Sequence, residues 1–206
     1  NPAPSVGGTL IIFLLHLLEK AKINNVQIHD LFQAMEVTNT ARKEICTNPN
    51  DEYQINKLME EEIFSSYYDK FSNQRSHIKD ESSKSNRGST THVSVIDKDQ
   101  NAACVTTTNG EGCGYILPGT GIMLNNMLGE EDLNLNGFNR WALDQRLTSM
   151  MSPSIGSYRE GGVLCIGSGG SNRIRSALLQ VLINLLDYKM PCEEAVTAPR
   201  IHYEAG

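Results

Sequence analysis

The chain has 206 residues, which suits one sizeable domain or a domain with an appendage. Its composition is globular, with 39% hydrophobic and 20% charged residues, and its net charge of -6 disfavours a nucleic-acid partner, because phosphate binding needs a basic surface. The five cysteines are odd in number and none has CxxC spacing, which disfavours a disulfide framework and a zinc site. We therefore expect free buried thiols, no bound metal and no cofactor.

The first third of the chain predicts helices. Apolar residues fill a helix over 8–21, whose hydrophobic run is far shorter than the roughly 20 residues that span a bilayer, so no membrane span is expected. Helical periodicity continues over 30–45, with Asp30 as a plausible N-cap, and again over 51–71.

Residues 72–89 are rich in Ser, Asn, Lys, Arg and Asp, which predicts a flexible linker. The character changes at Thr90. β-Branched residues alternate over 91–97, a turn follows at 98–101, and a second such run covers 102–108. These two runs predict a β-hairpin.

The last part of the chain mixes strands and helices. We expect a short buried strand over 161–166, a glycine-rich turn over 167–172 and an apolar helix over 173–186. A further helix over 192–198 and a final strand over 199–203 follow. Helices first, then strands mixed with helices, indicate an α+β fold. The chain lacks an initial methionine and stops just after a strand-like segment, so we expect a part of a longer protein.

Thr90 stands where the polar linker meets the first strand. A threonine inside a chain is a poor nucleophile, whereas one at a new N-terminus carries its own base, an α-amine with a reference pKa of about 7.7–8.0. A break between Ser89 and Thr90 would create that group. The hairpin would bring Thr106 to Thr108 beside Thr90, where a hydroxyl could orient it. The competing interpretation is that threonine is simply a good strand residue.

The glycine-rich turn at 167–172 joins a strand to a helix N-terminus. Its N–H groups and the helix dipole suit a phosphate or the oxyanion of a tetrahedral intermediate, and the Walker pattern is absent. A tight structural connection is the alternative. His92 invites pairing with Ser89 or Ser94, but neighbouring strand residues point to opposite faces, so we expect a structural histidine.

Two polar blocks follow the hairpin. The block at 124–132 contains two amides and three carboxylates, which suit a substrate ammonium group, a calcium-like cluster or a solvated acidic turn. The block at 147–153 offers hydroxyl groups before a proline.

In order and spacing, these blocks resemble the γ-glutamyltranspeptidase family of N-terminal nucleophile hydrolases. The similar segments lie at 1–8, 90–95, 106–108, 121–126, 149–153 and 167–174. The resemblance implies a four-layer αββα sandwich and a precursor that cuts itself between Ser89 and Thr90. It makes Thr90 the nucleophile, with its α-amine as base, and Thr108 its supporting threonine. The oxyanion pair falls on Gly169 and Gly170, although an ungapped count from the following arginine selects Gly170 and Ser171.

The resemblance also implies substrate contacts from Asn126, Glu130, Ser149 and Ser171. Two departures weaken the γ-glutamyl site. Met127 stands where the family places Gln or Glu, and a methionine replaces the second serine of the Ser-Ser-Met run that begins here at Ser149.

The resemblance divides the chain into three parts. Residues 1–71 would belong to the large subunit, 72–89 would form the linker that ends at the processing site, and 90–206 would form the small catalytic subunit. The implied partners are a γ-glutamyl compound such as glutathione, water or an amino acid as acceptor, and the two subunits of one precursor. Free cysteines allow a cytoplasmic location, and the resemblance allows a periplasmic or extracellular one.

Two other functions stay open. The altered binding block fits an acylase that cleaves another amide, such as a glutaryl group. The early part of the family sequence, which carries a substrate-binding arginine, has no match in this chain, and this fits a catalytically inactive, truncated relative.

Overall fold

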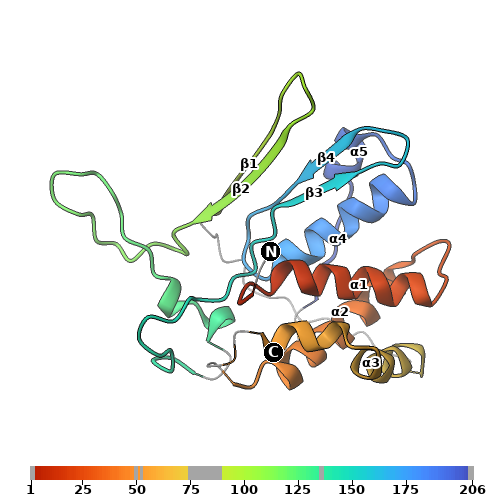
Figure 1. Cartoon of the computed structure of the whole chain (residues 1–206), viewed down its shortest axis with the longest axis horizontal. Helices are drawn as coiled ribbons and strands as arrows, with labels where there is room; N and C mark the ends of the chain where they lie inside the picture. Colours follow the sequence, from red (N-terminus) through yellow and green to blue (C-terminus); the bar gives the residue numbers. More distant parts are fainter. Residues whose placement is uncertain (1–2, 49–50, 52, 74–89, 135–136, 204–206) are drawn as a thin grey trace.

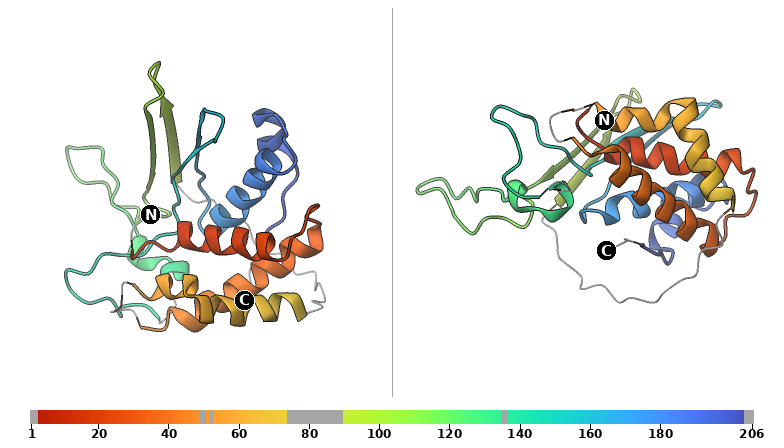
Figure 2. Two further views of the ribbon diagram at one scale, coloured as in Figure 1. Left: turned by 45° about the vertical axis from the view of Figure 1, so that its right-hand side comes forward. Right: turned by 90° about the horizontal axis from the view of Figure 1, so that it is seen from below.

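The computed structural model describes residues 3–48, 51, 53–73, 90–134 and 137–203. Helix α1 lies between two β-hairpins on one side and the helices α2 and α3 on the other (Figures 1 and 2). The helices are α1 (Gly7–Lys20), α2 (Ile28–Ile45), α3 (Glu61–Asn73), α4 (Arg173–Leu186) and α5 (Cys192–Thr197), with short 3-10 turns η1 (Gln54–Met59), η2 (Met127–Gly129) and η3 (Glu131–Leu133). The strands are β1 (Thr90–Ile96), β2 (Ala102–Thr108), β3 (Ser154–Ser157) and β4 (Val163–Ile166).

The main core forms around α1, because most of its apolar residues recur at helical spacing on the inward face, whereas Ile12 is exposed. Leu10, Phe13, Leu14 and Leu17 are fully or almost fully buried. The ring of Phe13 meets Phe64 of α3 edge-on, with centroids 5.5 Å apart. Apolar residues of α2, α3 and α4 complete this core.

The predicted helices are confirmed, with corrections at their ends. Asp30 is not the N-cap of α2. It is the third helical residue, and its carboxylate accepts a hydrogen bond of 2.8 Å from the backbone N–H of Gln27, which is the N-cap. The helix expected over 51–71 is interrupted at Glu60, whose extended backbone separates η1 from α3. Helix α3 then continues to Asn73, so the first two residues of the expected linker over 72–89 are helical, and 74–89 lie outside the described residues.

The predicted first hairpin is confirmed, although its first strand covers 90–96 rather than the expected 91–97. Strands β1 and β2 are antiparallel, and Thr90 pairs directly with Thr108. A second hairpin pairs β3 with β4, and its first strand was not predicted. Strand β4 is shorter than the expected 161–166, because Gly161 and Gly162 have positive φ angles and form the turn.

The strand expected over 199–203 is wrong. Ile201 forms no ladder; its N–H donates to the Gln180 side-chain oxygen at 3.0 Å, and its carbonyl accepts from the Gln180 amide at 2.8 Å. A side chain of α4 therefore occupies the place of a neighbouring strand. The mixture of helices and strands agrees with the α+β expectation, and the described strands form two separate two-stranded sheets.

All five cysteines are free thiols. Cys46, Cys104 and Cys165 are partly buried, whereas Cys113 and Cys192 are exposed. The expectation of buried thiols is wrong for these two exposed residues.

Candidate active site

Thr90 and Thr108 meet at the base of the first hairpin. The Thr90 hydroxyl donates to the Thr108 hydroxyl oxygen at 3.0 Å, and both side chains are partly buried. The N–H of Gly110 donates to the same Thr108 oxygen at 2.9 Å. Two donors therefore fix the Thr108 oxygen, which in turn orients the Thr90 hydroxyl. Ser89, and with it the predicted cleavage site, lies outside the described residues.

The glycine-rich turn after β4 lies against Thr90. A Cβ atom at Gly169 would sit 2.6 Å from the Thr90 carbonyl oxygen and 3.1 Å from its Cβ, so only glycine permits this approach. Gly170 has a φ of +117°, and Ser171 follows with a φ of +53°, so the chain reverses direction just before α4. The turn therefore lies against Thr90 and directly precedes α4, whose N-terminus carries the positive end of the helix dipole.

The two candidate pairs of oxyanion donors differ in their surroundings. Gly169 contacts the Thr90 backbone, whereas a Cβ at Gly170 would have the Arg173 side chain as its nearest neighbour, at 3.6 Å. Ser171 accepts a hydrogen bond from the Ile174 N–H at 3.1 Å through its carbonyl and so opens α4. The contact with Thr90 favours including Gly169 in the pair.

Asn126 and Glu130 converge on Gly110, two residues beyond Thr108. The Asn126 side-chain oxygen accepts from the Glu111 N–H at 2.7 Å, and the Asn126 N–H donates to the Asn109 carbonyl at 3.1 Å. A Cβ at Gly110 would sit 2.5 Å from a Glu130 carboxylate oxygen and would overlap the Asn126 side-chain oxygen. An amide and a carboxylate thus reach the strand end that carries Thr108. The sequence placed these residues in one block but gave no signal for their contact with Gly110.

The Ser149 backbone is hydrogen-bonded to the residues at the start of α1. Its carbonyl accepts from the N–H groups of Val6 at 3.0 Å and Gly7 at 3.2 Å, while its hydroxyl accepts from the Met151 N–H at 3.0 Å. The hydrogen bonds of Ser149 therefore connect it with the start of α1 and with Met151 rather than with β1.

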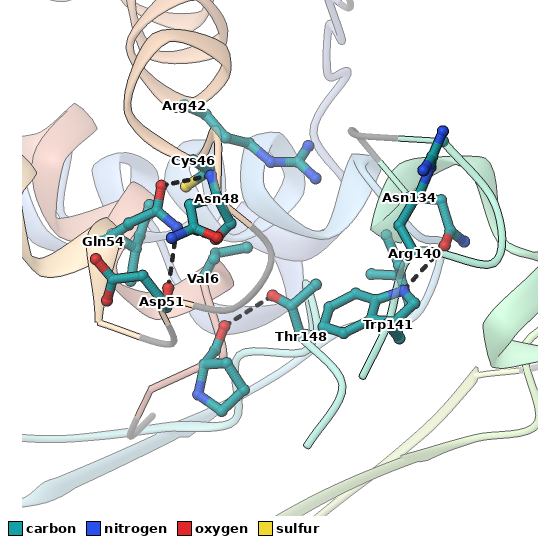
Figure 3. Close-up of a pocket in the computed structure, with 14 residues that line it drawn as sticks. Val6, Arg42, Cys46, Asn48, Asp51, Gln54, Asn134, Arg140, Trp141 and Thr148 are labelled. Atoms are coloured by element: carbon teal, nitrogen blue, oxygen red, sulfur yellow. Dashed lines mark hydrogen bonds between the residues drawn. The ribbon is translucent and has the colours of Figure 1, made fainter. Parts of the chain in front are cut away.

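A cavity of about 70 Å³ lies where α1 begins and α2 ends, and residues of 133–134 and 137–148 complete its wall (Figure 3). Thr90 is not among the residues that line it. Arg42, buried in its wall, donates to the side-chain oxygen of Asn172 at 3.4 Å, and Asn172 precedes α4 directly. Burial raises the pKa of the Cys46 thiol in the same wall, which keeps it protonated and a poor nucleophile. Nothing in the sequence pairs Arg42 with Asn172, so this link to the glycine-rich turn was missed.

His92 does contact Ser94, contrary to the expectation. Ser94 is two residues away along the strand and therefore shares a face with His92; its hydroxyl lies 2.8 Å from Nε2. The ring nitrogens of His92 contact the hydroxyls of Thr106 and Ser94 rather than that of Thr90.

In the part of the chain that the structure describes, no cluster of three or more His, Cys, Asp or Glu side chains is placed to hold a metal ion. None of the described helices is both long and apolar enough to cross a membrane.

Comparison with known proteins decides the family. The family model for gamma-glutamyltranspeptidase matches residues 1–206. The chain belongs to the gamma-glutamyltranspeptidase family. A glutathione hydrolase proenzyme of Pseudomonas sp. strain A14 is 28% identical over 98% of the chain and 39% of the relative. An acylase ACY 1 proenzyme of Pseudomonas sp. strain SE83 is 29% identical over 100% of the chain and 38% of the relative.

Solved structures of the family include a gamma-glutamyltranspeptidase from Pseudomonas nitroreducens complexed with L-DON. It is 32% identical to this chain, with a TM-score of 0.49 over 55% of this chain and 65% of the other. The chain spans about two fifths of the length of the two curated proenzymes described above.

Proposed function

We propose that the protein is an autoprocessed threonine hydrolase and transferase acting on γ-glutamyl compounds such as glutathione. The observation that carries the proposal is the Thr90–Thr108 hydrogen bond, with Gly169 packed against Thr90, in a chain of this family. Residues 1–71 would belong to the large subunit, 72–89 would be the linker, and 90–206 would form the small subunit. The complete protein would form the four-layer αββα sandwich.

The chemistry begins with cleavage of the Ser89–Thr90 bond, which frees the Thr90 α-amine. The amine accepts the Thr90 hydroxyl proton as Oγ1 attacks the γ-glutamyl carbonyl carbon. The backbone N–H groups of Gly169 and Gly170 stabilise the oxyanion that forms. Collapse breaks the amide bond, and the leaving amine takes the proton from the Thr90 ammonium group. Water or an amino acid then attacks the ester and restores Thr90.

Substrate selection would lie at the Gly110 end of the hairpin. The Glu130 carboxylate suits a substrate ammonium group, and Asn126 holds the loop that carries it. We assign Ser149 and Ser171 to the carboxylate end of the substrate. Met127 offers no strong hydrogen-bond acceptor at its position.

A second candidate function is cleavage of a glutaryl or similar amide that lacks the α-amine. Met127 and the similarity to an acylase proenzyme over the whole chain favour it.

The test is mass spectrometry and N-terminal sequencing of the full-length precursor, with Thr90→Ala and Thr91→Ala compared. We expect a product that begins at Thr90 in the wild type and in Thr91→Ala, and an uncut chain in Thr90→Ala. Thr91 is the matched control because it neighbours Thr90 on the opposite, exposed side of β1.

Turnover of γ-glutamyl and glutaryl p-nitroanilides then separates the two substrates. Preference for the γ-glutamyl compound supports the first function, and preference for the glutaryl compound supports the acylase. An intact Ser89–Thr90 bond in a folded precursor, without turnover, would identify an inactive relative and refute both.

A further inference from the structure

One face of the first hairpin carries a row of polar side chains that leads away from Thr90. Thr90, His92 and Ser94 alternate along β1 and therefore share that face. Their register partners on β2 are Thr108, Thr106 and Cys104. The row ends at the second hairpin, where the Cys104 thiol donates to the Ser154 carbonyl at 3.5 Å.

The His92 ring occupies the middle of this row and is held at both nitrogens. Nδ1 lies 2.8 Å from the Thr106 hydroxyl, and Nε2 lies 2.8 Å from the Ser94 hydroxyl. The ring also packs on Gly167, where a Cβ atom would overlap it. Gly167 has no left-handed φ, so the missing side chain makes room for the imidazole.

Strand β1 therefore contacts the glycine-rich turn at two points. His92 contacts Gly167, and Thr90 contacts Gly169, so alternate residues of the strand meet alternate glycines. A shift of the ring would change the distance between the turn and Thr90. Misplacement of reacting groups by about 1 Å can slow an enzyme about a hundredfold.

With the Cys104 thiol as donor to Ser154, one assignment of donors satisfies each hydrogen bond between Thr106 and Ser154 and places the imidazole proton on Nε2. The Cys104 thiol uses its hydrogen on Ser154, so the Ser94 hydroxyl donates to the Cys104 sulfur at 3.5 Å. The Ser94 oxygen then accepts from Nε2–H, and Nδ1 accepts from the Thr106 hydroxyl. One direction of donation runs from the Thr106 hydroxyl to the Ser154 carbonyl, and it selects the Nε2–H tautomer.

We propose that His92 is a positioning residue that holds the Gly167–Gly170 turn against Thr90 as the Nε2–H tautomer. The proposal rests on the proposed function, because the turn is taken to stabilise the oxyanion. His92 does not touch the reacting atoms in this arrangement, and its effect passes through Gly167.

The kinetic test uses the full-length precursor with His92→Ala, Gly167→Ala and the double variant. We expect each single change to lower kcat about a hundredfold with KM within about twofold, because geometry rather than substrate binding is disturbed. The double variant should be no worse than His92→Ala alone, since removal of the ring makes room for the new methyl group. Additive losses, or an unchanged kcat in His92→Ala, would overturn the proposal.

His202→Gln is the matched control, because His202 also pairs with a hydroxyl, that of Ser176 in α4 at 2.7 Å. It should keep wild-type kcat. His92→Gln keeps a donor near the Nε2 position and should recover part of the activity lost in His92→Ala. A His92→Gln variant as slow as His92→Ala would contradict the role of the Nε2–H donor.

A spectroscopic test needs no turnover and so separates this proposal from the proposed function. Selective ¹⁵N-histidine labelling, with His92 assigned by its loss in His92→Gln, should give the nitrogen shifts of an Nε2–H tautomer. An Nδ1–H tautomer would refute the proposed direction even in an active enzyme. The Nε2–H signature in a protein without turnover would instead contradict the proposed function alone.

Discussion

Glu44, near the end of α2, is bound by two side chains of α3. Its carboxylate accepts a hydrogen bond of 2.6 Å from the Tyr67 hydroxyl, and Lys70 Nζ lies 3.1 Å from the same oxygen. These two hydrogen bonds, that of Tyr67 first, lower the pKa of Glu44 below 4.5. Burial, followed by the hydrogen bond to Glu44, raises the pKa of Tyr67 well above its ordinary value.

The Glu44 cluster predicts a pH-dependent contribution to stability. A carboxyl group with a lowered folded-state pKa stabilises the fold above its unfolded pKa, and the contribution is lost as pH falls through the folded pKa. Because Glu44 and Lys70 are about half exposed, we expect Glu44→Gln to cost less than about 1 kcal/mol at pH 7. Thermal unfolding should show this difference disappear below about pH 4.5, the ordinary carboxyl value. A difference that stays constant with pH would contradict the charge mechanism.

Gly7 determines how closely α1 approaches the segment that carries Ser149. A Cβ at Gly7 would overlap the Met150 carbonyl oxygen and lie 2.7 Å from its carbon. We expect Gly7→Ala to destabilise the protein by about 1–3 kcal/mol, because backbone atoms must move apart. Denaturant unfolding measures the change. Gly129→Ala is the control: no atom lies within 4 Å of a Cβ there, so its effect should stay within about 0.5 kcal/mol.

The elements that the sequence predicted well are those with local causes. Alternation and a polar turn are sufficient for the β1–β2 hairpin, and its register follows from the turn, so the Thr90–Thr108 pairing was predictable. The final strand over 199–203 failed because strand formation needs a partner, and Gln180 supplied the hydrogen bonds instead. Long-range packing could not be predicted from the sequence either. The contact of His92 with Gly167 and that of Glu130 with Gly110 produce no periodic pattern in the chain.

At the scale of the whole molecule, residues before and after Thr90 share one core. Leu179 and Ile183 of α4 pack with the residues of α1, and Arg175 donates to the Asn39 side-chain oxygen at 2.9 Å. Cleavage at Ser89–Thr90 would therefore leave both pieces joined by buried apolar contacts. This association depends little on ionic strength, because apolar burial is not screened by salt.

We expect the two products of the cleaved precursor to coelute in size-exclusion chromatography, even in 1 M salt, and to separate only in denaturant. Gel electrophoresis of the eluted peak under denaturing conditions gives the two bands. Separate elution of the pieces in native buffer would show that the shared core does not hold them together.

The turn at the far tip of the first hairpin constrains how many residues the hairpin can contain. The Asp97 carboxylate accepts from the backbone N–H groups of Asp99 at 2.8 Å and Asn101 at 2.9 Å, which closes the tip tightly. Thr90 and Thr108 are 18 positions apart, and each is the end residue of a seven-residue strand. Substitutions along the outer side of the hairpin preserve that count, whereas deletion of one strand residue would turn the other face of the strand toward its partner. We therefore expect relatives to vary freely in the composition of this arm but to keep its number of residues.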